Sequence, residues 1–256
     1  MHFRKIIEGK QIIKGGPRLK LEGVNKNYEE IRVLHNLNLT IEDKEITCIL
    51  GPSGCGKSTL LNIMAGIIKP DAGSVKGDKK KVGYVFQEDR LLPWKTVYEN
   101  IKIVNKKASD LKLKSLINIV GLNHFENKYP AQLSGGMRQR CSIARAFNFE
   151  SEMLLMDEPF KSLDYDLRMN MVKSLIDIWH KWNNSIVFVT HEIDEALLLG
   201  NKIVVLTKNP CTVEEIININ IPQRLRNLED RELINIRTKL IRILSKQKKA
   251  HTYKSA

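Results

Sequence analysis

The chain has 256 residues, of which 42% are hydrophobic and 28% charged; this composition suits a soluble globular protein with one sizeable α/β domain and excludes a disordered chain. No unbroken apolar run is long enough to cross a bilayer, and the N-terminus has no apolar secretory core, so we expect a cytoplasmic protein. The net charge of +13 suits nucleic acid, acidic lipid or a phosphate ligand, but the lysines are spread out and favour a solvated basic surface.

Short apolar runs and one clearly alternating segment predict a series of strands. In chain order, the expected strands cover residues 18–28, 33–41, 46–50, 82–87, 153–158, 185–191 and 202–207. A helix is expected from Lys57 to an end marked by Gly66 and Pro70, and another over 166–182. Residues 91–148 look mostly helical.

Strands that alternate with helices predict a mostly parallel sheet covered on both faces, and therefore an α/β fold. We expect residues 1–17 to form an extension, and residues 18–90 and 150–215 to form the core. The helical block 91–149 interrupts the alternation and is expected to form a subdomain. The tail, 216–256, should dock one helical face on the domain through four residues at helical spacing: Leu233, Ile236, Leu240 and Ile243.

The loop after the third strand reads G-P-S-G-C-G-K-S-T and fits the phosphate-binding pattern G-x-x-x-x-G-K-[ST]. An accidental glycine-rich turn is the alternative, but the strand before and the helix after supply the context that the pattern requires. Backbone N–H groups would converge on phosphates, Lys57 would neutralise the β and γ phosphates, and Ser58 would ligate Mg²⁺. The predicted nucleotide-binding residues are Gly51, Pro52, Ser53, Gly54, Cys55, Gly56, Lys57, Ser58 and Thr59.

Two further motifs extend this site. In M-L-L-M-D-E, two carboxylates follow a buried strand, so Asp157 would hold Mg²⁺ through water and Glu158 would polarise an attacking water. Standing alone, such a pair would more often cap the next helix. In L-S-G-G-M-R-Q-R, Ser134 suits an N-cap, and Gly135 and Gly136 leave the helix start open to an anion. An ordinary capped helix would explain the serine but not the paired glycines.

These motifs occur in the order of the ATP-binding cassette of ABC transporters, which the chain resembles from about Leu19 to its C-terminus. The resemblance identifies Tyr28 as the aromatic that stacks on adenine and Gln87 as the glutamine that senses Mg²⁺ and water. It makes Asp164 part of the D-loop and His191 the switch histidine at the γ-phosphate. Taken singly, Tyr28 could be a surface tyrosine, Gln87 a strand-end residue and His191 a strand cap.

The resemblance implies a P-loop NTPase (RecA-like) core with a mostly parallel sheet, a small antiparallel β subdomain and a helical signature subdomain. It implies ATP and Mg²⁺ as cofactors. It also implies a head-to-tail dimer, in which Ser134 and Gly136 of one copy cover the nucleotide of the other. Three departures concern Lys161 where relatives carry a small residue, the short stretch 75–82, and the absence of a proline in 149–152.

The resemblance further implies integral membrane permease subunits as partners, at the cytoplasmic face of the membrane. After Gln87, an apolar and aromatic surface could receive a permease helix or pack the subdomain: Leu91, Leu92, Trp94 and Tyr98. The sequence is most similar to those of importers of the nitrate, sulfonate and taurine type, which receive their solute from an extracytoplasmic solute-binding protein. An exporter or lipoprotein-release motor stays open. A nucleic-acid-associated ATPase is not expected, because the chain has one cassette and no insertion.

Overall fold

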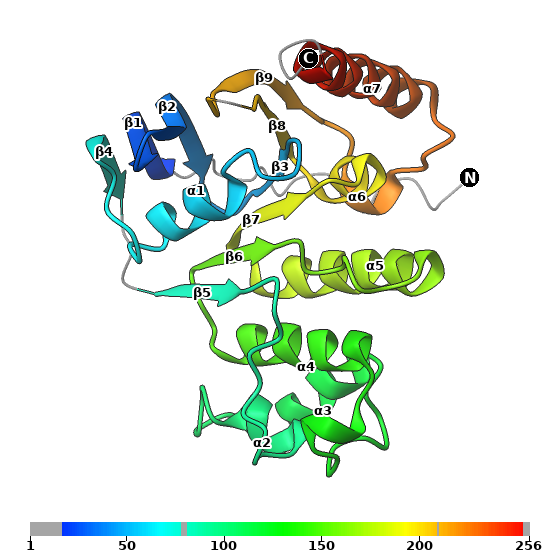
Figure 1. The fold of residues 1–256 in the computed structure, drawn as a ribbon. Helices are drawn as coiled ribbons and strands as arrows, with labels where there is room; N and C mark the ends of the chain where they lie inside the picture. The colour runs from blue at the N-terminus through cyan, green and yellow to red at the C-terminus, as the bar shows by residue number, and fades with distance from the viewer. Residues whose placement is uncertain (1–16, 78–80, 209, 253–256) are drawn as a thin grey trace.

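The computed structural model describes residues 17–77, 81–208 and 210–252, so the predicted extension 1–17 lies, apart from Pro17, outside the described residues. A central six-stranded sheet organises the chain (Figure 1). Its order is β5 (Val82–Val85), β6 (Met153–Asp157), β7 (Ser185–Thr190), β3 (Ile46–Leu50), β8 (Lys202–Leu206) and β9 (Val213–Asn218). The first five strands are parallel and β9 is antiparallel to β8, which confirms the predicted α/β fold with a mostly parallel sheet.

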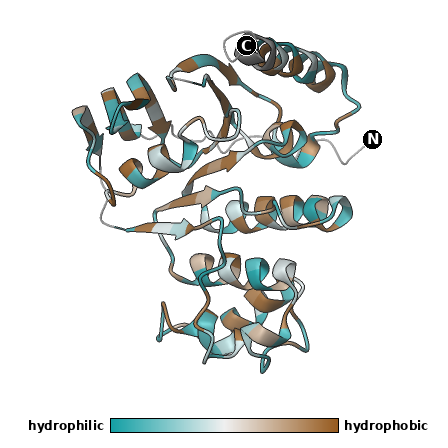
Figure 2. Ribbon diagram, viewed as in Figure 1, coloured by the Kyte–Doolittle hydropathy of each residue, from teal (hydrophilic) through white to brown (hydrophobic). Residues whose placement is uncertain are grey.

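Both faces of this sheet are buried, which explains why its strands are continuous apolar runs rather than alternating ones. Cys48 of β3 belongs to a core cluster shared with helices on one face. Its neighbour Ile49 belongs to a second cluster, shared with α1 (Lys57–Met64) and the N-terminal strands. Figures 1 and 2 show this arrangement, with brown apolar strands between the two layers. Each fully buried leucine or isoleucine contributes roughly 2 kcal/mol to folding.

A second, smaller sheet is antiparallel and has the strand order β2-β1-β4. It consists of β1 (Pro17–Tyr28), β2 (Ile31–Glu42) and β4 (Ala72–Gly77). Strand β4 was not predicted, because A-G-S-V-K-G contains one large apolar residue and two glycines. Glycine is required at Gly73, where φ is +86° and a Cβ would lie 2.3 Å from the backbone oxygen of Gly23.

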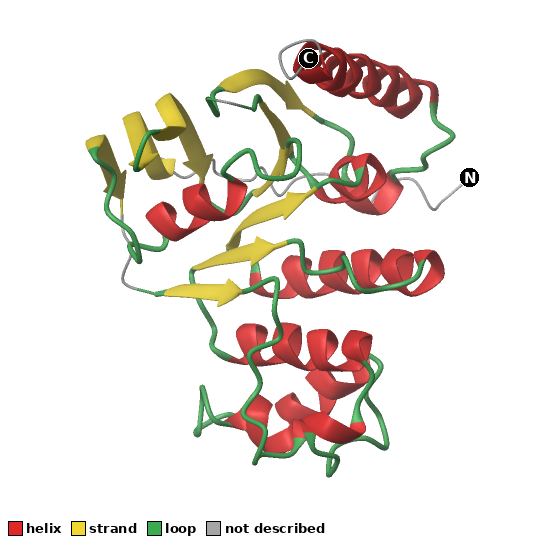
Figure 3. Cartoon of the chain, in the orientation of Figure 1, coloured by secondary structure: helices red, strands yellow, loops and turns green. Residues whose placement is uncertain are grey.

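Three helices lie in the chain between β5 and β6 and pack on one another (Figure 3). They are α2 (Val97–Lys102), α3 (Asp110–Ile119) and α4 (Gly135–Asn148). A polar side chain begins each helix: Thr96, Ser109 and Ser134 each accept a hydrogen bond from a backbone N–H of the first turn. The strand predicted over 82–87 ends at Val85, so Gln87 lies in the loop that leads to these helices.

The remaining helices are α5 (Tyr165–Trp182), α6 (Ile193–Leu199) and α7 (Arg231–Thr252), with short 3-10 turns at Pro130–Gln132 and Gln223–Leu225. The predicted docking of the tail is confirmed: Leu233 and Leu240 are fully buried and Ile236 and Ile243 pack against the core. All four residues lie on α7. Among the described residues, no helix is long and apolar enough to span a membrane.

Candidate nucleotide site

The glycine-rich loop joins β3 to α1 and leaves its backbone open. Gly54, at φ +72°, has nothing within 4 Å of the position that a Cβ would take. Gly56 is the N-cap of α1 at φ +108°, and a Cβ there would lie 2.8 Å from Cγ1 of Val33, so only glycine fits. The first turn of α1 has no acidic residue, so its positive end is free for an anion.

Lys57 is held over this loop by the loop itself. Its side chain is 5% exposed, and its Nζ donates hydrogen bonds to the carbonyl oxygens of Gly51 at 2.9 Å and Pro52 at 3.0 Å. A buried ammonium group is costly unless it is hydrogen-bonded. The loop therefore fixes one positive charge beside its own backbone N–H groups.

One cavity brings together the three residues predicted as metal ligands. It measures about 550 Å³ and is lined by Ser58, Gln87 and Asp157 together with Asn62, Ile67, Tyr84, Phe86, Glu88 and Arg90. A hydroxyl, an amide oxygen and a carboxylate are the hard oxygen donors that Mg²⁺ prefers. The donor set therefore fits a magnesium ion.

Asp157 lies at the carboxyl end of β6, where ligands bind in parallel sheets. Its pKa is raised, chiefly because burial disfavours the charged carboxylate, while a hydrogen bond from the Ser58 hydroxyl acts in the opposite direction. The neighbouring Glu158 raises the pKa further. A divalent cation in the cavity would relieve this burial cost by favouring the ionised form.

Glu158 follows β6 in a left-handed backbone conformation, with φ +46°. Its N–H donates to the carbonyl of Val189 on β7, at 3.0 Å, which ties the residue to the edge of the sheet. Its carboxylate is surrounded by basic groups: Oε1 lies 3.8 Å from Nζ of Lys57, and Oε2 lies 3.0 Å from Nζ of Lys161 and 3.5 Å from Nδ1 of His191. The predicted base and the predicted switch histidine are therefore neighbours.

The turn that contains His191 is stabilised by the buried carboxyl group of Glu195. Glu195, 2% exposed, accepts a hydrogen bond from Oγ1 of Thr190 at 2.5 Å. Oγ1 of Thr190 in turn accepts from the N–H of Glu192 at 3.0 Å. Burial is the main reason that the pKa of Glu195 is raised to about 7. Of this turn, the motifs in the sequence mark only His191.

The second glycine motif does not contribute to this cavity. Among the described residues that line it, none belongs to 134–136. Ser134 is exposed and caps α4 through the N–H of Met137, at 3.3 Å. Gly136 packs instead on the D-loop, since a Cβ there would lie 2.9 Å from Cδ2 of Leu163. Asp164 caps α5 by accepting from the N–H of Leu167, at 2.9 Å.

Tyr28 also lies away from the cavity lining. It ends β1, its side chain is 44% exposed, and Nζ of Lys26 lies 5.6 Å from the ring centroid. An exposed aromatic face beside a cation can stack on a flat ring. Its role at adenine stays a prediction, as do the roles of the other site residues.

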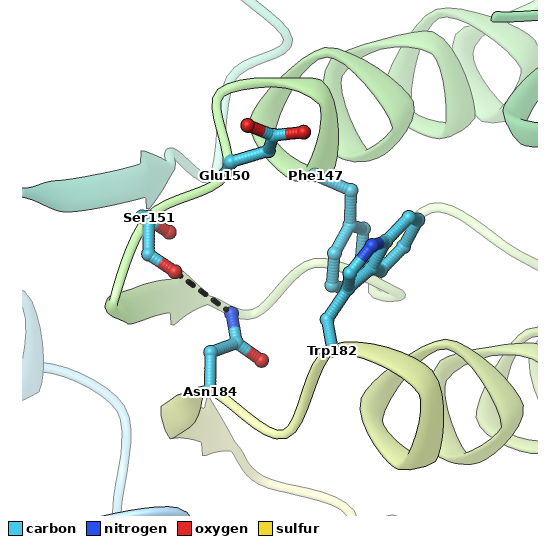
Figure 4. Close-up of a pocket in the computed structure, with 5 residues that line it drawn as sticks. All are labelled: Phe147, Glu150, Ser151, Trp182 and Asn184. Carbon is cyan, nitrogen blue, oxygen red and sulfur yellow. Dashed lines mark hydrogen bonds between the residues drawn. The ribbon is translucent and has the colours of Figure 1, made fainter. Parts of the chain in front are cut away.

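A second cavity, of about 170 Å³, lies at the amino ends of the strands, next to the starts of β6 and β7 (Figure 4). The ring of Phe147 stacks on that of Trp182 at 5.7 Å, and Nδ2 of Asn184 donates to the carbonyl of Ser151 at 3.4 Å. None of the residues predicted to bind nucleotide lines it. The predicted chemistry therefore concentrates at the carboxyl ends of the strands.

Comparison with known proteins agrees with this geometry. The family model described as "ABC transporter" matches residues 34–161, half of the chain. The chain belongs to this family. An uncharacterised ABC transporter ATP-binding protein of Methanocaldococcus jannaschii is 40% identical to the cassette over 89% of this chain and 91% of its own. The aliphatic sulfonates import ATP-binding protein SsuB of Bacillus cereus is also 40% identical, over 80% of this chain and 87% of its own.

Solved structures give the same result. A dimeric ATP-binding cassette, in a post-hydrolysis state with ADP and Pi, matches with a TM-score of 0.70 and 32% identity, covering 79% of this chain and 99% of that one. The protein cbiO1 of Clostridium perfringens, part of an ABC transporter complex, matches with a TM-score of 0.70 and 27% identity, covering 89% and 97%. The cassette is thus an ATPase of the ABC type.

The cassette also contains a link between the loop after Gln87 and the helical block, which no motif in the sequence indicates. Nε of Arg138 on α4 lies 2.9 Å from Oδ2 of Asp89, two residues after Gln87. Nη1 of Arg145 donates to the carbonyl of Arg90 at 2.9 Å. The basic spacing of R-Q-R-C-S-I-A-R was visible in the sequence, but its partners were not.

Proposed function

We propose that the cassette is the ATP-binding and ATP-hydrolysing subunit of an ABC importer, which couples nucleotide-driven dimerisation to uptake of a small solute through a separate permease. The observation that carries the proposal is the single cavity that combines Ser58, Gln87 and Asp157 beside the glycine loop. The open backbone at Gly54 supports phosphate binding at the same place.

In this proposal each group has one task. Lys57 neutralises the β and γ phosphates, and Ser58, Gln87 and Asp157 hold Mg²⁺, directly or through water. When bound, that ion supplies charge neutralisation and polarisation of the phosphates. Glu158 orients and polarises the attacking water. His191, 3.5 Å from the Glu158 carboxylate, contacts the γ-phosphate.

A second copy of the cassette completes the site. Ser134, Gly135 and Gly136 of one copy face the nucleotide of the other, with Asp164 beside them. Two observations support this. These glycines do not line the cavity of their own chain, as far as the described residues go. A structural relative is a dimer.

The import direction and the solute rest on the relatives. SsuB is named for aliphatic sulfonate import, so we propose a nitrate-, sulfonate- or taurine-like anion or a related metabolite. An extracytoplasmic binding protein would deliver it to the permease. The cassette would bind the permease at the cytoplasmic face. Trp94, which is 69% exposed, supports a docking role after Gln87 rather than a packing role. No nucleic acid is expected as a partner.

The first test is the substitution Glu158→Gln. The variant should bind ATP and Mg²⁺, lose turnover by about a hundredfold or more, and accumulate as a dimer. The measurements are phosphate release and the sedimentation of the protein with and without ATP. Hydrolysis at the wild-type rate would show that Glu158 is not the base.

The second test addresses import. The cassette is purified together with its permease and reconstituted, and ATP hydrolysis is measured with and without loaded binding protein. We expect hydrolysis to rise when loaded binding protein is added on the outer side. Hydrolysis that ignores the binding protein would favour an exporter.

A further inference from the structure

Lys161 has its side chain directly over the carboxylate of Glu158. Nζ of Lys161 lies 3.0 Å from Oε2, the shortest distance between that carboxylate and any basic group of the described residues. The backbone arranges this contact. Glu158 has φ +46°, and the N–H of Lys161 donates to the Glu158 carbonyl at 3.2 Å, so the tight turn brings the side chain of residue i+3 back over residue i.

The two oxygens of this carboxylate have different surroundings. Oε1 faces Lys57, on the side of the glycine loop, at 3.8 Å. Oε2 lies nearest to Lys161 and His191, is buried, and accepts no well-directed hydrogen bond from the described residues. One oxygen is thus held by an outer cation while the other is turned toward the place where phosphates are proposed to bind.

Neither Lys57 nor His191 is placed to replace Lys161 as the partner of Oε2. Nζ of Lys57 is fixed by hydrogen bonds to two loop carbonyls and lies nearest to Oε1. His191 is 42% exposed and lies between two carboxylates, since its Nε2 is 3.6 Å from Oε1 of Glu192. An ion pair between fully exposed groups contributes little to stability, but here the Glu158 side chain is only 10% exposed while Lys161 is 51% exposed.

We propose that Lys161 is a positioning residue for hydrolysis: it anchors Oε2 of Glu158 and thereby keeps Oε1 directed at the attacking water. This inference rests on the proposed function, in which Glu158 is the base. Lys161 does not line the cavity that would hold nucleotide and Mg²⁺. Its loss should therefore slow the chemical step without weakening ATP binding, because a base that is free to rotate spends less time in the productive geometry.

The test compares three variants of the full-length protein. Lys161→Ala removes the anchor, Lys161→Arg keeps a cation within reach, and Lys173→Ala is the control, an exposed lysine on α5 outside the site. We expect kcat of Lys161→Ala to fall roughly tenfold with KM for ATP unchanged within about twofold, and Lys161→Arg to restore most of the loss. Lys173→Ala should behave as the wild type.

Other outcomes would overturn the inference. An unchanged kcat in Lys161→Ala, or equal losses in the Ala and Arg variants, would show that no anchoring charge is needed. A rise in KM together with the loss of kcat would mean that the lysine binds nucleotide instead. In the Glu158→Gln background, Lys161→Ala should cause no further loss, because the lysine acts through Glu158.

The same series separates this inference from the proposed function. If Glu158→Gln is inactive but Lys161→Ala turns over normally, only the positioning role fails. If Glu158→Gln turns over normally, the assignment of the base fails, whatever the lysine does. Melting temperatures of all variants, expected within a few degrees of the wild type, show that each one folds.

Discussion

Glu158 combines two features that are costly for folding. Its backbone has φ +46°, in a region that non-glycine residues seldom occupy, and its carboxylate is nearly buried. The hydrogen bond from its N–H to Val189 holds the strained conformation in place. Strain that is fixed by the end of a strand is characteristic of residues held for chemistry, and here it aims a carboxylate at the glycine loop.

Lys57 lends itself to a direct test of the phosphate site. We expect Lys57→Ala to weaken binding of ATP about tenfold or more, because a charge-assisted contact to the phosphates is lost. The measurement is a titration with a fluorescent ATP analogue, with Lys173→Ala as the matched lysine control. An unchanged dissociation constant would contradict the role of Lys57.

The turn after β7 connects three elements. Thr190 ends β7, Glu195 lies on α6, and Arg168 of α5 pairs with Glu192 at 2.7 Å and lies 3.6 Å from Glu195. These contacts fix Thr190 and Glu192, the residues on either side of His191. The buried Glu195 therefore helps to position the turn, although the family motif marks only the histidine. The nearby guanidinium of Arg168 compensates only part of the cost of burying a charge on Glu195.

This burial predicts a pH dependence of stability. The pKa of Glu195 is raised from 4.5 to about 7, so between these values the folded state keeps a proton that the unfolded state has lost. Stability from this group is therefore present below pH 4.5 and is lost as the pH rises through 7. Glu195→Gln removes the titration and keeps an acceptor for Thr190.

We expect the stability of Glu195→Gln relative to the wild type to increase by about 1 to 3 kcal/mol between pH 5 and pH 8. Urea unfolding at both pH values measures it. The exposed Glu229→Gln serves as the matched control variant. A constant difference for Glu195→Gln would mean that this carboxyl does not titrate in the window.

Elements with one strong signal were predictable, and those with mixed signals were not. The strand Ile46–Leu50 has the bounds predicted, because a five-residue apolar run between turn residues has one interpretation. The strand V-E-E-I-I-N pairs only at the edge of the sheet, and I-D-E-A-L-L-L is short, so β9 and α6 were missed. Local sequence carries little information about elements that tertiary contacts define.

The candidate site also contains residues that could be predicted from the sequence and residues that could not. The glycine loop and the D-E pair have a fixed spacing along the chain, so their residues could be named from the sequence. The contact between Lys161 and Glu158 depends on a single positive φ, and the pairing of Arg138 with Asp89 joins residues 49 apart in the chain. Neither could be read from a motif, although the contact with Lys161 sets the surroundings of the proposed base.

Within one chain the two glycine motifs lie in different places. The glycine loop opens into the cavity, while Ser134 and Gly136 stand at the exposed start of α4. The ion pair between Asp89, two residues after Gln87, and Arg138 of α4 links the two regions. We therefore propose that a second copy places its signature, residues 133–137, over the nucleotide of the first.

Ser134→Asp tests this proposal, because aspartate is a good N-cap and preserves α4 while placing a negative charge where the partner's phosphates are proposed to lie. Alone, the variant should bind ATP normally but hydrolyse it roughly tenfold more slowly or worse. Lys57→Ala should also be inactive alone, since it has an intact signature but a defective phosphate loop.

Mixing these two defective variants should restore hydrolysis. Random pairing makes half of the dimers mixed, and each mixed dimer contains one intact loop opposite one intact signature. If each site acts independently, about a quarter of the wild-type activity should return. Phosphate release is followed as the ratio of the variants is changed, and recovery should peak near equal amounts. Full activity of Ser134→Asp alone would contradict a site shared between copies, because the charge would then face no phosphate at all.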